Sequence, residues 1–286
     1  MNKEFLRTSR FFQKTYRHKG ILNSQNFEKE VDLRCYEPSP EMAEFVDVYF
    51  IARWDRQGKL PYIAADILTQ PVVNLFFTAG GAFVQWPAMG VRRFKVGDSG
   101  VYAGVKFKPG AFYSFCAELQ VDTKTPADTF FPGATSQFSS ELLRLADGDI
   151  LEGMERLLLD MRPQLHSKQE VVAKVMRDIA ENSAHSVGSL AEKYKISERT
   201  LQQIAKQYVG IGIKQVMMRT RLLTAVEYGL EKKPNWTTIA AELNYSTQSH
   251  FTNDFKRYIG VSPSQYTKLT TIDELEPIAE KSTVIL

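Results

Sequence analysis

Two short segments of the chain carry side chains that can recognise DNA bases. In residues 198–208 and 247–258, amide, hydroxyl and basic side chains gather on one face of a predicted helix. Arginine can donate two hydrogen bonds to guanine, and glutamine or asparagine can pair with adenine in the same bidentate way. The predicted base-reading residues are Arg199, Gln202, Gln203, Gln248, Ser249, His250, Thr252 and Asn253.

Basic residues near these faces could bind the phosphates of the DNA backbone, because lysine and arginine bind phosphate without reading sequence. The predicted phosphate contacts are Lys206, Arg219, Arg221, Lys256 and Arg257. On the two faces only Glu198 and Asp254 carry carboxylates that would repel phosphate. A solvated helix surface is the alternative for all of these residues, and for His250 a packing role explains the residue equally well.

The two segments belong to an internal repeat. Residues 206–216 recur as residues 256–266, with lysine, tyrosine, glycine and glutamine at matching places. Upstream, residues 189–197 align with residues 238–246. Self-similarity of this kind indicates one supersecondary unit used twice.

Each unit has the pattern of a helix-turn-helix. A short first helix offers a small residue, Ala191 or Ala240, where the second helix must cross closely. Ser197 or Ser246 is then predicted to cap the second helix, because a serine oxygen can accept from the free amides of the first turn. The inward apolar residues of the second helices are Leu201, Ile204, Tyr208, Phe251, Phe255 and Tyr258.

A continuous helix is predicted between the units, from Ile213 to Leu230, because the segment lacks proline and has helical apolar spacing. Such a helix is about 27 Å long at 1.5 Å per residue. It could hold two recognition helices in successive major-groove segments, which lie about 34 Å apart on one DNA face. Arg219 and Arg221 on this helix, with Lys232 and Lys233 after it, would then meet phosphates.

The positive charge is concentrated in the same region. The whole chain of 286 residues has a net charge of only +3. Residues 186–268 alone contain 12 lysines and arginines against 6 acidic residues. The overall value is therefore a cancellation, and the basic part is the part predicted to face DNA.

The N-terminal half predicts a β-rich domain. Strand-length runs of β-branched and aromatic residues are separated by turn dipeptides such as Gly80-Gly81 and Pro109-Gly110. The runs are 46–54, 63–68, 72–78, 82–86, 92–96 and 101–107. Short strands at this spacing are typical of a small barrel or sandwich. Trp54, Trp86, Phe107 and Phe112 would line a ligand pocket in it or fill its interior.

Helical spacing follows over residues 138–146, 150–161 and 167–181. In the last of these, the stripe of Val171, Val175 and Ile179 favours a dimer contact over packing on the β-domain. The expected class is α+β, with a β-rich barrel-like or sandwich-like domain and an all-α double helix-turn-helix domain. The expected segments are a basic arm at 1–30, a regulatory domain at 31–183, the helical domain at 186–268 and a loose acidic tail at 269–286.

Residues 186–268 resemble the two-helix-turn-helix DNA-binding domain of AraC-family transcriptional regulators. Residues 239–266 follow the family signature closely, whereas Ala205, Gly212-Ile213 and Asn244 depart from it. Residues 105–113 resemble a segment in a subgroup of these regulators whose N-terminal domain has no well-defined ligand. The resemblance implies promoter DNA as the partner of the second domain, and an effector or a dimer partner for the first.

Other classes of protein find little support in the residues. The longest apolar run, Val72 to Phe77, is broken by Asn74, so no membrane span is expected. Histidines 18, 166, 185 and 250 lack ligand spacing, and the two cysteines, Cys35 and Cys116, cannot form a four-thiolate zinc site. We expect no metal, cofactor or catalytic residue, and a cytoplasmic protein because no secretory apolar segment follows the basic start.

The sequence therefore predicts a sequence-specific transcription regulator, gated by its N-terminal domain, forming a homodimer and acting with RNA polymerase and a small-molecule effector. Two alternatives remain open. One is a small-molecule sensor or enzyme in the β-domain. The other is a protein-interaction module whose helix-turn-helix units have lost DNA affinity.

Overall fold

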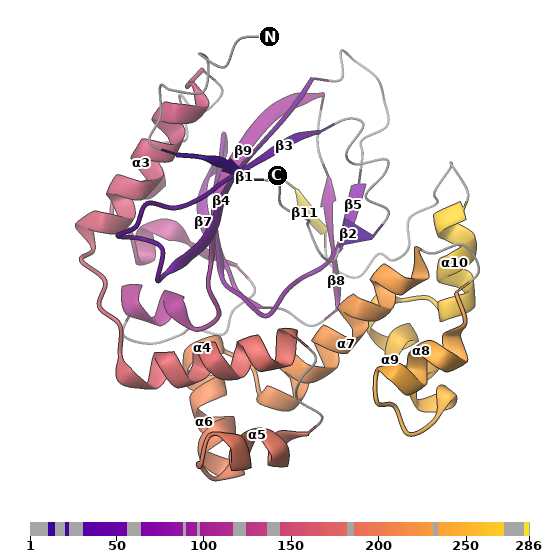
Figure 1. Cartoon of the computed structure of the whole chain (residues 1–286). Coiled ribbons are helices and arrows are strands. Elements are labelled where there is room, and N and C mark those ends of the chain that lie inside the picture. The colour runs from indigo at the N-terminus through magenta and orange to yellow at the C-terminus, as the bar shows by residue number, and fades with distance from the viewer. Residues whose placement is uncertain are drawn as a thin grey trace.

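A β-rich domain precedes a helical domain in the computed structural model of the chain (Figure 1). The structure describes residues 11–14, 21–22, 31–55, 64–87, 90–95, 98–116, 124–135, 144–181, 186–230, 234–271 and 283–285. Most of the basic arm, the segment 136–143, Lys232, Lys233 and most of the acidic tail lie outside these residues.

The larger sheet of the β-domain is antiparallel, in the order β1-β3-β4-β9-β6-β7-β10. Its strands are β1 Gln13–Lys14, β3 Asp32–Tyr36, β4 Val46–Asp55, β6 Asn74–Thr78, β7 Gly81–Gln85, β9 Ser99–Phe107 and β10 Lys124–Pro126. The long central strands β4 and β9 pair in a register that sets Phe50 opposite Gly104. A Cβ on Gly104 would lie 2.3 Å from the Phe50 ring, so only glycine leaves room for that ring.

A smaller sheet has the order β11-β8-β5-β2. Its strands are β2 Ile21–Leu22, β5 Ala64–Leu68, β8 Val91–Lys95 and β11 Thr283–Ile285. β11 pairs with β8 in parallel, so the last residues of the expected loose tail join the β-domain instead. Phe50, Phe76, Phe94 and Tyr102 pack in the space between the two sheets.

The opposite face of the larger sheet is covered by α3, Asp147–Asp160, and by the 3₁₀ helix η2, Ala111–Phe115. Leu151 and Leu158 of α3 and Phe112 of η2 meet Phe107 of β9 in one core. A second 3₁₀ helix, η3, spans Ala127–Thr129 beside β7. This face is fully packed with aromatic and aliphatic side chains.

The helical domain is built from two successive clusters. Its helices are α4 Ser167–Ala180, α5 Val187–Lys193, α6 Glu198–Val209, α7 Ile213–Gly229, α8 Trp236–Glu242, α9 Gln248–Ile259 and α10 Pro263–Thr271. The first unit packs α4, α5, α6 and the start of α7 together. The second unit packs the end of α7 with α8, α9 and α10.

The predicted α+β class is confirmed, and each predicted strand corresponds to one in the structure. β3 was missed because the polar sequence Asp-Leu-Arg-Cys-Tyr gives no clear alternation. Residues 144–146, the described end of the helix predicted at 138–146, are not helical.

The predicted dimer stripe was wrong. Val175 is 0 % exposed and Ile179 is 3 % exposed, and both pack with α6 and α7 of the same chain. The stripe is therefore the inner face of α4 in the first helix-turn-helix unit. Val171, the third residue of the stripe, is partly buried against the same cluster.

Candidate nucleic-acid interface

The first recognition helix, α6, begins and ends as its sequence predicts. The Ser197 Oγ accepts from the Thr200 amide at 3.0 Å, and the helix ends at Gly210, whose φ of 87° favours glycine. Leu201 and Tyr208 are buried against the rest of the unit. The opposite face is open: Arg199, Gln203 and Lys206 are exposed, and Gln202 is half-buried.

The second recognition helix, α9, begins one residue later than predicted. Its cap is Thr247, whose Oγ1 accepts from the His250 amide at 3.1 Å; Ser246 lies in the turn before it. The repeat itself contained this signal, because its offset rises from 49 residues at Ala191 and Ala240 to 50 residues beyond the turn. The second turn thus contains one additional residue.

The outer face of α9 presents the predicted base readers. Gln248, Ser249, His250 and Asn253 are exposed and Thr252 is half-buried, with Lys256 and Arg257 exposed in the last turn. On the inner face, Phe251 stacks on Trp236 with ring centroids 5.9 Å apart. This aromatic packing fixes which side of α9 faces solvent.

Two of these side chains are held by neighbours. The Gln248 Oε1 accepts from the Thr237 Oγ1 at 3.1 Å, and the His250 Nε2 lies 3.6 Å from an Asp254 carboxylate oxygen. Thr237 was not among the predicted residues, because it lies on α8 and only the fold brings it beside α9. It orients the amide that we expect to read a base.

The linking helix α7 is present as predicted, with 17 residues. At 1.5 Å per residue it is about 26 Å long. Figure 1 shows it running from the first unit to the second. Arg221 on this helix is half-buried, with its guanidinium 5.8 Å from the Tyr245 ring centre.

Arg219 is not placed as a phosphate contact. Its side chain is 0 % exposed, and its Nη2 donates to the Thr69 Oγ1 of the β-domain at 2.5 Å. The prediction failed because an arginine on an otherwise amphipathic helix looks solvent-exposed in sequence. The β-domain covers this side of α7, which sequence spacing could not indicate.

Both units are docked on the β-domain. In the first unit, Tyr208 of α6 packs on Tyr113 of η2 with ring centroids 4.5 Å apart, and the Gln169 amide of α4 donates to the Gly110 carbonyl at 3.0 Å. In the second, Leu22 and Leu68 of the smaller sheet join the core cluster. Docking leaves the outer faces of α6 and α9 exposed.

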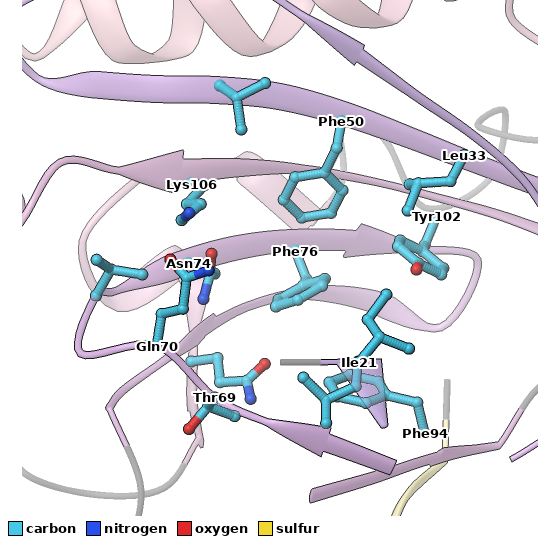
Figure 2. Close-up of a pocket in the computed structure, with 14 residues that line it drawn as sticks. Ile21, Leu33, Phe50, Thr69, Gln70, Asn74, Phe76, Phe94, Tyr102 and Lys106 are labelled. Atoms are coloured by element: carbon cyan, nitrogen blue, oxygen red, sulfur yellow. The ribbon is translucent and has the colours of Figure 1, made fainter. Parts of the chain in front are cut away.

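A pocket with a cavity volume of about 120 Å³ lies between the two sheets (Figure 2). Phe50, Phe76 and Phe94 form an apolar part, and Thr69, Gln70, Asn74 and Lys106 lie together at its other side. Gln85, 3 % exposed, also lines it, and its Oε1 has no hydrogen-bond partner among the described residues. The pocket therefore offers an apolar surface and a polar end.

The aromatic residues singled out in the sequence do not line this pocket. Trp86, Phe107 and Phe112 belong to the packed core on the opposite face of the larger sheet. Trp54 packs on Tyr102 with ring centroids 5.8 Å apart. Interior packing, the alternative interpretation, accounts for all of them.

Both cysteines, Cys35 and Cys116, are free thiols. Cys35 is buried, and burial raises its pKa to about 12, so it stays protonated at neutral pH. Among the described residues, no group of three histidine, cysteine or acidic side chains could hold a metal ion. In the same part of the chain no helix is long and apolar enough to cross a membrane.

Comparison with known families gives two adjacent matches. Residues 190–269 match a family described as a helix-turn-helix domain, and residues 34–126 match a domain of unknown function, DUF6597. An uncharacterized HTH-type transcriptional regulator of Haemophilus influenzae is 29 % identical over 30 % of this chain and 29 % of its own length. The transcriptional activator RhaS of Pectobacterium carotovorum is 28 % identical over 44 % of this chain and 51 % of its own length.

The helix-turn-helix domain at residues 190–269 is of the AraC type. Among solved structures, the C-terminal domain of AraT, a response regulator from Geobacillus stearothermophilus, is 29 % identical, covers 37 % of this chain and 91 % of that one, and has a TM-score of 0.34. The chain spans only about a third to a half of the curated relatives named above. The AraC-family domain coincides with α5 to α10, and the DUF6597 match coincides with the β-domain.

Proposed function

We propose that this protein is a sequence-specific DNA-binding transcription regulator that places α6 and α9 in successive major-groove segments of promoter DNA. The observation that carries the proposal is the duplicated helix-turn-helix with two exposed, amide-rich helix faces. The names of the matched relatives, which are transcriptional regulators and activators, support it.

The base readers in this proposal are Arg199, Gln202, Gln203, Gln248, Ser249, His250, Thr252 and Asn253. Lys206, Arg221, Lys256 and Arg257 hold the phosphates. Gln248 is the best-positioned of the base readers, because its amide is already fixed by Thr237. A preorganised amide loses less rotamer freedom when it pairs with adenine.

The test is selection of genomic fragments by the purified full-length chain. A recovered consensus with two half-sites about one helical turn apart is expected, since recognition helices on one DNA face repeat at about 34 Å. Recovery of fragments without any shared motif would reject the proposal. A protein-interaction module, the alternative, requires recognition faces that are covered or neutral, and the described faces of α6 and α9 are neither.

The β-domain pocket supports gating by a small-molecule effector. An amphipathic molecule fits its chemistry, with an apolar body against Phe50 and Phe76 and a hydrogen-bond donor toward Gln85. A panel of amphipathic metabolites, screened by thermal shift, should yield a ligand whose affinity falls at least tenfold in Gln85→Leu. The surface variant Gln13→Leu should bind it normally; equal binding by both variants would place the ligand elsewhere.

The remaining partners belong to the same proposal. The protein acts in the cytoplasm on double-stranded promoter DNA, as a homodimer that contacts RNA polymerase. Because the α4 stripe is covered within the chain, the dimer must use another surface. Sedimentation of the full chain with and without its DNA would test this part.

A further inference from the structure

The middle of α7 is fixed to the wall of the pocket through one buried residue. Arg219, 0 % exposed, donates to the Thr69 Oγ1 at 2.5 Å. Thr69 is itself 8 % exposed, follows β5 directly and lines the pocket. One contact therefore joins the pocket to the helix that connects the two helix-turn-helix units.

Three consecutive residues contact three parts of the molecule. Leu68 packs in the core of the second unit, Thr69 accepts from Arg219 of α7, and Gln70 lines the pocket beside Thr69. Figure 2 shows Thr69 and Gln70 together at the polar side of the pocket, near Asn74. A shift of this short segment cannot leave α7 and the second unit unchanged, because close-packed interiors transmit small displacements.

The surroundings of Arg219 make the contact sensitive to position. Burial, together with the nearby positive charge of Arg92, lowers the pKa of Arg219 to about 10, so the guanidinium is still charged at neutral pH. The electrostatic energy of a buried charge depends strongly on the positions of the polar atoms around it, since little water is present to screen the charge. A small displacement of Thr69 therefore changes the interaction energy that holds Arg219, and with it α7, in its present position.

We propose that Thr69 and Arg219 transmit occupancy of the pocket to α7, and that α7 then changes the spacing of the two recognition helices on DNA. The inference rests on the proposed DNA-binding function and assigns the route by which its effector acts. Arg219 is a positioning residue in this scheme and does not contact DNA. Its partner Thr69 is the pocket-side half of the link.

The test measures how well the full-length chain discriminates half-site spacing. Affinity is measured for duplexes that carry the selected half-sites at the best spacing and at spacings two base pairs shorter or longer. Wild type should prefer the best spacing at least tenfold. Thr69→Val, which removes only the hydroxyl acceptor, should reduce this preference to threefold or less, while affinity for the best duplex changes less than threefold.

Two control variants separate the link from general damage. Thr69→Ser keeps the hydroxyl and should keep the wild-type preference. Thr224→Val removes a hydroxyl that donates to the Thr220 carbonyl within α7, and it should also behave as wild type. If Thr69→Val retains the tenfold preference, the link is overturned.

The pocket side is tested without a ligand by filling the pocket. Val72 lines it, and Val72→Phe, or Val72→Leu if the larger residue prevents folding, should change the spacing preference at least threefold in wild type. The same change in a Thr69→Val background should have no further effect. A full effect in that background would overturn the inference.

Failure of the inference differs from failure of the proposed function. A wild-type chain that binds the selected motif but shows no spacing preference overturns the inference and leaves DNA binding intact. A wild-type chain that binds no motif above random DNA rejects the proposed function, and the link falls with it.

Discussion

The two recognition helices differ in how strongly neighbouring side chains hold their outer-face residues in the DNA-free protein. On α9, Thr237 holds Gln248 and Asp254 lies beside His250. Among the described residues, Arg199, Gln203 and Lys206 on α6 have no such side-chain contact. Because ordered side chains lose less entropy on binding, α9 should supply more of the sequence preference. The first unit also departs more from the family signature.

The double variant Gln248→Ala and Asn253→Ala should relax sequence preference more than it lowers non-specific affinity. Each bidentate pair contributes about 1–3 kcal/mol of discrimination between bases. Binding to the selected motif and to single-base mismatches is measured by fluorescence anisotropy. Gln13→Ala, on the exposed strand β1, is the surface control. Equal losses on matched and mismatched DNA would argue against base readout by these residues.

The cap of α9 can be tested by two neighbouring substitutions. Thr247→Ala removes the oxygen that accepts from the His250 amide and should lower the free energy of unfolding by about 1 kcal/mol. Ser246→Ala is the matched control, because Ser246 lies exposed in the turn and should change stability little. Urea denaturation checks both, and the reverse order would restore Ser246 as the cap.

At the scale of elements, α4 packs in the first helix-turn-helix unit although its sequence lies before the expected boundary at residues 183–186. Val172, Val175, Met176 and Ile179 are buried in the same cluster as α5, α6 and α7. The helix also contacts η2 through Gln169, whose amide donates to the Gly110 carbonyl and to the Ser114 Oγ. α4 therefore connects the β-domain to the first unit.

A fragment that lacks α4 should be much less stable than one that includes it. Burial of each apolar side chain contributes about 1.5–3 kcal/mol, and small domains have a total stability of only about 5–15 kcal/mol. Fragment 164–271 should melt cooperatively, whereas fragment 186–271 should show a lower helix content and a broad transition. Circular dichroism during heating measures both. Identical transitions would mean that α4 only covers a unit that is already complete.

At the scale of the whole molecule, the β-domain holds both helix-turn-helix units while their outer faces stay open. Tyr113 contacts the first unit, Leu22 and Leu68 contact the second, and Thr69 contacts α7 between them. The β-domain therefore contacts the first unit, the second unit and the helix that connects them. It does so without covering the outer faces of α6 and α9.

Charge distribution predicts a steep response to salt. If the basic residues of the helical domain contact six to ten phosphates, affinity of the full chain should fall by about 10³–10⁵ between about 50 and 200 mM salt, because binding releases condensed counterions. Lys256→Ala should weaken binding on all sequences and reduce the slope by about one ion. Filter binding at several salt concentrations measures this. A flat response would contradict phosphate contact.

The sequence by itself determined the two units and their open faces. A repeat, an inward aromatic face and glycine at the helix ends are local features, and they predict α6, α7 and α9 to within a residue or two. The strands of the β-domain were likewise predicted from short runs of neighbouring residues. The family resemblance at residues 239–266 rested on the same residues, because a helix-turn-helix is specified by short-range spacing.

Only the tertiary structure decided what lies between the units and the β-domain. Arg219 has the same sequence signature as an exposed phosphate ligand, yet the smaller sheet covers it. The stripe on α4, which the sequence favoured as a dimer contact, packs on its own chain. The pocket likewise gathers Gln85, Lys106 and Thr69 from three separate strands and loops. Such contacts depend on how distant segments pack, and helical or strand periodicity specifies only which face is buried, not what buries it.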